Sequence, residues 1–423
     1  MSASGYIPTI TANHSIPARI DVRAATLRKI CTIAAVTFVA MLPVTILVAP
    51  LKELIAVRYG ATPFWTHSFM SVNMIGAILG APLIALLADR NRLRRRVVVL
   101  ALAADAVLLA SMAVMPSLTA ILIVRFFEGV AHILALSTLM AMGSAWADKT
   151  HRGRAMGIIG AAMMFGTACG TRLGGLIWAH LTTPHWTFLV AGAIAGVAAF
   201  GTLLIVREAP SEHRPERRDR NPFDLLRINP SLIAAYAYAF IDRLCVGVVI
   251  STFTLFLAES HGLDPKARSL LLVMFLLPFA LLVLPAGWMA DRIGRIVPMA
   301  LGSIGFGVVF GCYGFLPMDD LYLAMLLSGI FSAIMFAPNL TLCADLAPPA
   351  QRGAAFTGFN IAGSLGFVLG PLMAGGLFTI LTHQGTPASA YRVTFIATGA
   401  LEILCALMTL PFLLRLRRTG VTR

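Results

Sequence analysis

Charged residues are scarce in this sequence, and lysine is nearly missing. Only 12% of the 423 residues are charged, against about 25% in soluble domains, and 58% are hydrophobic. The chain has 33 basic residues, of which four are lysines, so arginine supplies most of the positive charge. A chain this apolar cannot shield its surface from water. The composition therefore excludes an ordinary soluble domain and predicts a protein surrounded by lipid.

The signatures of several enzymes and metal sites are also missing. The six cysteines lie inside apolar runs without a CxxC pair or a Cys/His ligand spacing, which predicts buried free thiols. The sequence contains no Walker A string, no HExxH and no paired aspartates of a membrane protease. We therefore expect a protein that is not an enzyme and that holds no cofactor and no metal.

Long hydrophobic runs make up most of the chain. Twelve of them reach the length of about 20 residues that a helix needs to cross a bilayer. They lie near 30–51, 66–88, 97–115, 118–145, 155–179, 186–206, 231–257, 269–290, 297–316, 321–346, 354–381 and 391–414. Six fall on each side of the Arg- and Pro-rich segment 207–230. This pattern predicts an all-α membrane protein of two six-helix bundles joined by a solvated linker.

The basic residues predict the orientation in the membrane. The net charge is +14, but the cations form short clusters between the runs and no single patch, so we expect no nucleic-acid partner. With the N-terminus inside, 25 of the 33 cations lie on the cytoplasmic side and five outside. We therefore expect a bacterial inner-membrane protein with cytoplasmic tails at 1–25 and 415–423, bundles at 26–206 and 231–414, and a cytoplasmic linker.

Two short charged strings recur about two hundred residues apart. Each places an acid and a base at the end of an apolar run. The members are Asp89, Arg90, Asp148 and Arg152 in the first half, and Asp291, Arg292, Asp345 and Arg352 in the second. A carboxylate at a helix end can lock two helices in one state and release them in another. We interpret these strings as gating loops, with a static cap and topology signal as the alternative.

The first of these strings, after the second and eighth runs, resembles the loop signature of the major facilitator superfamily. The second copy keeps that signature's usual glycines, Gly287 and Gly294, whereas Ala85 and Arg92 replace them in the first copy. The resemblance covers essentially the whole chain. It implies twelve transmembrane helices in two pseudo-symmetric bundles that work by alternating access.

Two further stretches carry the same resemblance. The fourth run contains Arg125 and Gly129, similar to the arginine–glycine signature of the family. Residues 166–175 resemble the glycine-rich signature of drug/proton antiporters, although Thr171 stands where proline is expected. The equivalent stretch, 366–376, keeps its proline as Pro371. Small residues about four apart let helix backbones pack closely, either as a surface that rocks or as ordinary tight packing.

Charged residues inside the runs are the candidates for proton coupling. Arg125 and Glu128 are three residues apart and share a helix face. Asp105 lies in the middle of the preceding run, and Asp242 lies near the middle of the seventh. A titrating carboxylate beside a fixed arginine predicts a proton relay. A structural ion pair that never changes protonation is the alternative.

Four other polar residues are candidates for the substrate cavity: Arg172, Arg243, His132 and Asn339. Arginines inside a membrane could hold an anionic group on a substrate, or they could only bridge helices. We expect a monomeric secondary transporter whose partners are a small molecule, protons and the bilayer. The predicted task is proton-coupled efflux of a drug or metabolite. Uptake or exchange of a small organic anion such as a carboxylate is the alternative, and a receptor without flux is a third reading.

Overall fold

The computed structural model describes residues 16–88, 94–146, 152–208, 226–227, 229–348 and 351–418, and these residues form helices and no strand. The first half contains α1 (Ile16–Ile46), α2 (Pro63–Ala88), α3 (Arg94–Ser111), α4 (Leu118–Trp146), α5 (Arg152–His180) and α6 (Pro184–Ile205). The second half contains α8 (Leu232–Val248), α9 (Thr254–Glu259), α10 (Pro265–Ile293), α11 (Ile296–Cys312), α12 (Met318–Leu346), α13 (Arg352–Thr382) and α14 (Pro387–Arg418).

Four short helical turns extend the longer helices. Two are π-helices, η1 (Lys52–Val57) after α1 and η3 (Val249–Phe253) between α8 and α9. Two are 3₁₀ turns, η2 (Met112–Val114) after α3 and η4 (Tyr313–Phe315) after α11. Both π-helices follow the first helix of their half, so even this irregular feature is duplicated. Inserted turns of this kind are frequent at functional sites.

Eleven helices of the described chain are long and apolar enough to cross a membrane, and α8, η3 and α9 form one such span, Leu232–Glu259. The twelfth long helix, α2, has 26 residues but a more polar first half, which contains His67, Ser68, Ser71 and Asn73. These polar side chains are buried, and two of them contact the second half, as described below. The chain is therefore a multi-pass membrane protein.

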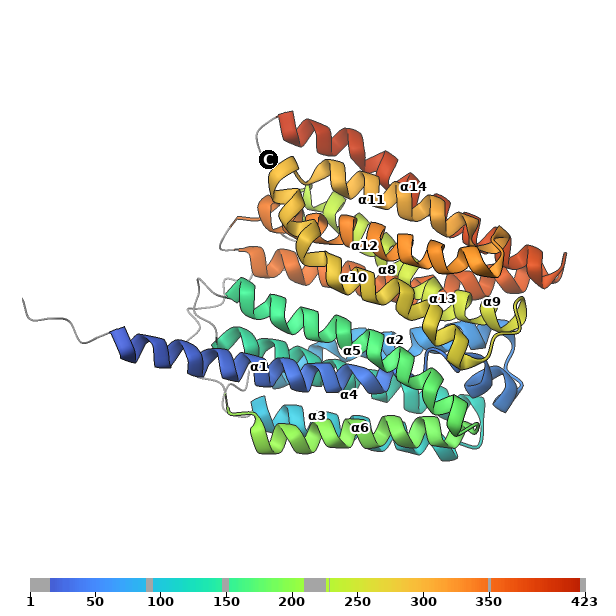
Figure 1. Cartoon of the computed structure of the whole chain (residues 1–423), viewed down its shortest axis with the longest axis horizontal. Helices are drawn as coiled ribbons and strands as arrows, with labels where there is room; N and C mark the ends of the chain where they lie inside the picture. The colour runs from blue at the N-terminus through green and yellow to red at the C-terminus, as the bar shows by residue number, and fades with distance from the viewer. Residues whose placement is uncertain are drawn as a thin grey trace, which may run out of the picture.

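The two halves repeat the same pattern of helix packing. In the first half α1 packs on α5, α2 on α4, and α3 on α6. In the second half the corresponding pairs are α8 with α13, α10 with α12, and α11 with α14. Figure 1 shows the first half, coloured blue to green, below the second half, coloured yellow to red. This confirms the predicted fold of two pseudo-symmetric six-helix bundles.

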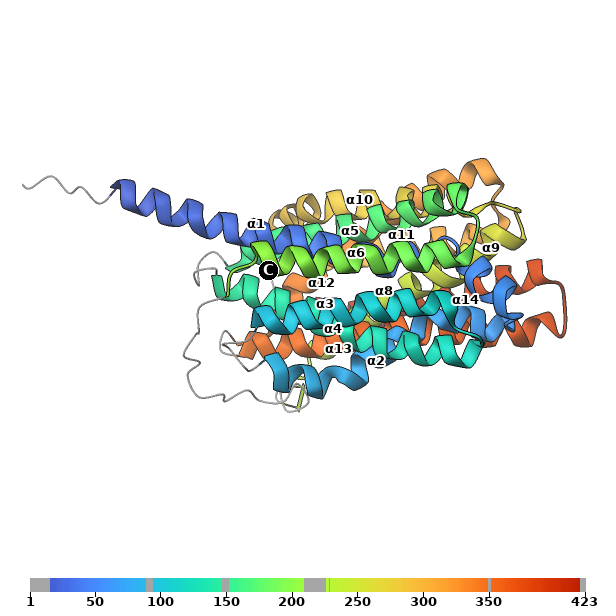
Figure 2. The same cartoon turned by 90° about the horizontal axis from the view of Figure 1, so that it is seen from below.

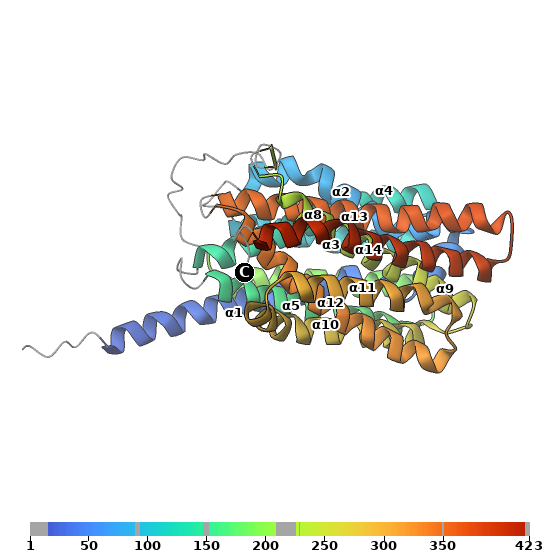
Figure 3. The same ribbon diagram turned by 90° about the horizontal axis from the view of Figure 1, so that it is seen from above.

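The halves meet along two pairs of helices, α5 with α10 and α2 with α13. Figures 2 and 3 show that α1 begins and α14 ends at the same end of the molecule. We call this the terminal end and the opposite one the distal end. The helices α5 and α13 begin at the terminal end, whereas α2 and α10 begin at the distal end.

Glycines allow close helix packing at several of these contacts. A Cβ at Gly174 would overlap the carbonyl oxygen of Ile46 in α1, and one at Gly370 would overlap the carbonyl oxygen of Leu244 in α8. The two predicted glycine-rich stretches thus allow close backbone packing within each half, of α5 on α1 and of α13 on α8. Gly175 lies at the contact between halves, because a Cβ there would meet Pro265 and Ser269 of α10.

We expect Gly174→Ala to reduce folding stability by about 1–3 kcal/mol, the usual cost of overpacking a tight contact. The matched control is Gly201→Ala on α6, where an added Cβ meets nothing within 4 Å. The midpoint of thermal unfolding in detergent, followed by size-exclusion chromatography, measures both. Equal midpoints for the two variants would show that the α1–α5 contact tolerates a methyl group.

Candidate functional site

Four charged or titratable side chains meet inside the first half. Helix α4 presents Arg125, Glu128 and His132, which share a face because they are three and seven residues apart, and α3 supplies Asp105. Arg125 Nη1 donates to Glu128 Oε2 at 2.9 Å, and His132 Nδ1 lies 3.4 Å from Asp105 Oδ2. All four are buried. We call them the α3/α4 cluster.

The α3/α4 cluster is enclosed by α2 as well. The guanidinium of Arg125 lies 5.1 Å from the centre of the Phe69 ring. Gly129 packs against the backbone of Asn73, where a Cβ would overlap the carbonyl oxygen. Because both contacts come from α2, which also packs on the second half, a change in the cluster can be transmitted to the contact between the halves.

The charges of the α3/α4 cluster balance only when it holds one extra proton. Two carboxylates face one arginine, so the fourth member, His132, or one of the acids must be protonated for neutrality. Glu128 Oε1 and Asp105 Oδ1 are buried and have no hydrogen-bond partner in the described part of the chain. A buried site favours the neutral state because unbalanced charge is costly there. The geometry is thus suited to binding and releasing a single proton.

The same residues have a spacing compatible with metal ligands. One ligand atom from each of Asp105, Glu128 and His132 lies within 4.8 Å of the others. However, Arg125 already neutralises Glu128 at 2.9 Å. A divalent cation would therefore share its site with a guanidinium, so the charge arrangement favours a proton over a metal.

A second group of predicted residues lies on α8. Asp242 is buried, and Arg243 Nε lies 3.6 Å from its Oδ2, beyond ordinary hydrogen-bond distance. The guanidinium of Arg243 lies 5.1 Å from the Phe336 ring and 5.4 Å from the Phe367 ring. Arg243 thus contacts α12 and α13 of its own half. Its side chain is 22% exposed.

Glu402 on α14 is a fully buried acid. It accepts hydrogen bonds from Ser303 on α11 and from Cys245 Sγ on α8, the latter at 3.4 Å. Both of these donors are neutral. The site therefore joins three helices of the second half without an arginine, unlike the α3/α4 cluster.

Several polar contacts join the two halves toward the distal end. Arg268 on α10, which is fully buried, forms an ion pair with Glu53 on η1. Arg172 Nη1 on α5 donates to the carbonyl of Lys266 at 2.8 Å and to Ser269 Oγ at 2.9 Å. We call these contacts the distal latch. The structure thus places Arg172 between the halves, where it bridges helices.

Helix α2 adds two further bonds between the halves. His67 Nδ1 lies 2.9 Å from Thr252 Oγ1 of the π-helix η3. Ser71 Oγ donates to the carbonyl of Val368 on α13 at 2.8 Å, near the middle of the bundle. Both π-helices therefore contact the opposite half, η1 through Glu53 and η3 through Thr252. The described conformation is held together at its distal end.

The terminal end of the second half contains a charged clamp. Arg295, between α10 and α11, donates to Asp291 Oδ1 and to Asp345 Oδ2, each at 2.6 Å. Burial alone would lower the pKa of Arg295, but these two hydrogen bonds raise it above its ordinary value. Arg295 thus joins the ends of α10 and α12. Arg292 instead lies over the Trp288 ring at 3.6 Å.

The other predicted gating residues are only partly visible. Asp89, Arg90 and Asp148 lie outside the described residues. Arg152 and Arg352 are the first residues of α5 and α13, and their side chains are outside the description. The remaining cavity candidate, Asn339, is buried in α12, and its Oδ1 has no hydrogen-bond partner in the described part of the chain.

Comparison with solved structures supports the fold. A bacterial homologue of the human lysosomal transporter Spinster, in an inward-facing and unoccupied conformation, has a TM-score of 0.72 at 16% identity, over 91% of this chain and 96% of that one. The nucleoside transporter NupG also has a TM-score of 0.72, at 14% identity, over 90% of this chain and 98% of that one.

The sequence relatives and a family model agree with the structures. The MdtD protein of Salmonella newport (strain SL254), whose name assigns it to multidrug resistance, is 29% identical over 148 residues. That match spans 33% of this chain and 30% of the relative. The model of the Major Facilitator Superfamily matches residues 33–242 and 235–422. Since these stretches cover most of the sequence, the chain belongs to the Major Facilitator Superfamily.

Proposed function

We propose that this protein exports a small organic molecule in exchange for protons, by alternating access. The observation that carries the proposal is the α3/α4 cluster, where two buried acids meet one arginine and one histidine. Such a site is neutral with one proton bound and carries one negative charge without it. The cost of that charge inside a membrane couples proton occupancy to conformation.

Efflux as the direction is supported by the name of the MdtD relative, which matches a third of the chain. The distal latch supports alternating access, because state-specific contacts at one end must break for the other state to form. In the proposed orientation the terminal end is cytoplasmic, as the basic residues predict. The proposed bundles are 26–206 and 231–414, the protein is monomeric, and the membrane is the bacterial inner membrane.

Uptake or exchange of an organic anion is the second candidate, and Arg243 favours it. This cation lies near two aromatic rings of its own half, Phe336 and Phe367, and its side chain is 22% exposed. Its neighbour Asp242 contacts it only at 3.6 Å, which leaves donor capacity for a carboxylate. Arg172 gives no such support, because its Nη1 binds Lys266 and Ser269.

Transport assays on the purified protein in liposomes test both candidates. A panel of organic cations, anions and neutral compounds, with ethidium and fluorescein as fluorescent members, is assayed with and without an imposed pH gradient. Movement of a compound against its own gradient, driven by the pH gradient, supports proton-coupled export. Fluorescein exchange that ignores the pH gradient and is lost in Arg243→Gln would favour the anion exchanger and contradict proton coupling.

The clamp centred on Arg295 gives a prediction about gating. Arg295→Gln leaves Asp291 and Asp345 facing each other without a cation, which destabilises the state that the clamp holds. We expect the initial rate of transport to change about 5- to 150-fold, the range of couplings of about 1–3 kcal/mol. Arg292→Gln is the matched control, three residues away on the Trp288 ring. If the two variants change the transport rate equally, the clamp has no gating role and the loop serves only as a topology signal.

A further inference from the structure

A cavity of about 290 Å³ lies at the terminal end of the first half, away from the charged clusters described above. Its walls are formed by α1, the end of α4 and the segment that follows α6. Among the described residues that line it, three are cations and none is an acid. The lining residues are Arg28, Lys29, Thr32, Ile33, Trp146, Ile205, Val206 and Arg207.

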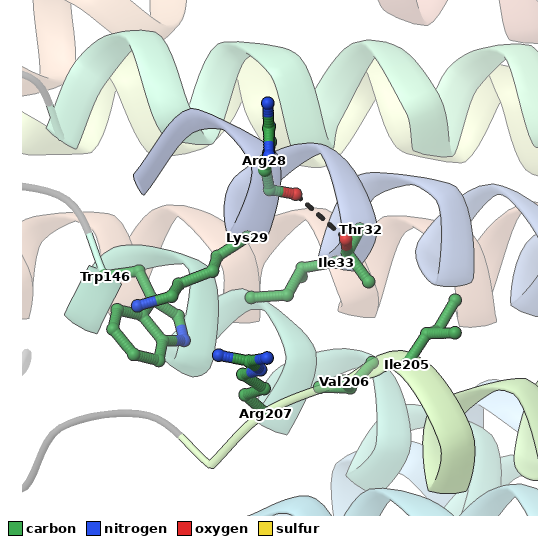
Figure 4. Close-up of a pocket in the computed structure, with 8 residues that line it drawn as sticks. All are labelled: Arg28, Lys29, Thr32, Ile33, Trp146, Ile205, Val206 and Arg207. Carbon is green, nitrogen blue, oxygen red and sulfur yellow. Dashed lines mark hydrogen bonds between the residues drawn. The ribbon is translucent and has the colours of Figure 1, made fainter. Parts of the chain in front are cut away.

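Two of the cations converge on the same space. Figure 4 shows the side chains of Lys29 and Arg207 reaching toward it beside the indole of Trp146, whereas the Arg28 side chain points away. Lys29 Nζ lies 3.5 Å from the centre of the Trp146 ring. The acid next along the chain, Glu208, accepts from the backbone N–H of Arg95 on α3 with both carboxylate oxygens, at 3.2 Å. The carboxylate of Glu208 is thus bound to the start of α3.

We propose that this cavity binds a phosphate-bearing anion between Lys29 and Arg207, and that the head group of an anionic membrane lipid is its source. An ammonium and a guanidinium on opposite walls supply donors for phosphate oxygens. Basic pockets between the ends of transmembrane helices bind such head groups, and tryptophan is enriched at that depth.

The apolar surroundings favour a lipid over a soluble phosphate. Leu203, Leu204 and Ile205 at the end of α6 are 47%, 65% and 56% exposed, and Leu27 on α1 is 52% exposed. These side chains provide a surface for acyl chains next to the cationic pocket. A bound lipid would join α1 to the ends of α4 and α6, helices that belong to the half carrying the α3/α4 cluster.

Native mass spectrometry of the full-length protein tests this site directly. The protein is incubated with dioleoyl phosphatidylglycerol, with dioleoyl phosphatidylcholine or with inorganic phosphate. We expect bound phosphatidylglycerol in wild type, about fivefold weaker binding in Lys29→Gln or in Arg207→Gln, and roughly 20-fold weaker binding in the double variant. Lys29→Arg and Arg207→Lys should retain binding. Unfolding midpoints of all variants exclude a folding defect as the cause.

Arg415→Gln is the matched control, since Arg415 is an exposed cation at the terminal end of α14, outside the cavity. An equal loss of phosphatidylglycerol in this control would overturn the site in favour of non-specific attraction. Phosphatidylcholine bound as tightly as phosphatidylglycerol would overturn the requirement for an anion. Displacement of phosphatidylglycerol by millimolar inorganic phosphate would overturn the lipid as the source and assign the cavity to a soluble anion.

Discussion

Replacing Glu128 by glutamine is expected to reduce transport driven by a pH gradient strongly while exchange of substrate across the membrane continues. Exchange needs no net proton movement, whereas accumulation does. We expect the pH-driven component to fall about 5- to 150-fold, the range of couplings of about 1–3 kcal/mol between two sites. The same split is expected for Asp105→Asn, since Asp105 belongs to the same cluster. Parallel counterflow and pH-driven assays in liposomes measure it.

Two further variants make this result specific to the α3/α4 cluster. Removing one partner of a buried ion pair costs about 3–5 kcal/mol, so Glu128→Gln could reduce folding. The double variant Arg125→Gln, Glu128→Gln removes both charges and should fold. Because Asp105 then again needs one proton for neutrality, this variant should recover part of the pH-driven transport that Glu128→Gln loses. Glu402→Gln is the matched control, because Glu402 is equally buried but is bound by neutral donors. Full pH-driven transport in both Glu128→Gln and Asp105→Asn would refute the relay.

Replacing Arg268 by glutamine is expected to open the distal end. The change leaves Glu53 without its ion-pair partner. Among the described residues, this is the ion pair that joins η1 to the second half. Truncating one partner of a buried, hydrogen-bonded charge pair costs about 2–5 kcal/mol. Since about 1.4 kcal/mol shifts an equilibrium tenfold, the population with an open distal end should rise at least about tenfold.

The opening is measured in the variant Ser71→Cys. The measured quantity is the rate at which a membrane-impermeant thiol reagent, added from the distal side, labels the introduced cysteine. Ser71 is fully buried where α2 meets α13, and cysteine is close to serine in size. The background lacks the exposed cysteines Cys31, Cys169 and Cys312. The matched control is Glu259→Gln, which removes the charge from the acceptor of the Tyr391 hydrogen bond within the second half. Equal labelling rates of Ser71→Cys with and without Arg268→Gln would rule out a latch at Arg268.

The sequence predicts the fold well because its strongest signals are local. Runs of about 20 apolar residues and the repeated charged strings predict two bundles, and the helix pairing repeats in both halves. The Arg125–Glu128 pair was also predictable, since three residues of spacing places both side chains on one helix face. Asp105 was a candidate for a different reason, because it is an acid in the middle of the preceding apolar run.

Contacts between distant helices could not be predicted in this way. Glu53 and Arg268 are 215 residues apart, and their pairing depends on how far α10 slides along the first half. The sequence named His132 and Arg172 as candidates for a substrate cavity, but it did not predict that His132 lies beside Asp105 or that Arg172 binds Ser269 of the other half. The charged string placed Arg292 beside Asp291, so the sequence predicted Arg292 as the gating cation. In the clamp, Arg295 is the residue that contacts both Asp291 and Asp345. The spacing of residues within one helix does not specify how neighbouring helices are shifted along each other.

Proton movement recorded during substrate transport tests proton coupling most directly. Purified protein is placed in liposomes containing a pH-sensitive dye, and an outward gradient of a compound identified by the panel is imposed without a pH gradient. Wild type should drive protons in the direction opposite to the substrate, and Glu128→Gln should move substrate by exchange without a proton signal. Substrate movement by wild type without any proton flux, or an undiminished proton signal in Glu128→Gln, would contradict proton exchange at the α3/α4 cluster.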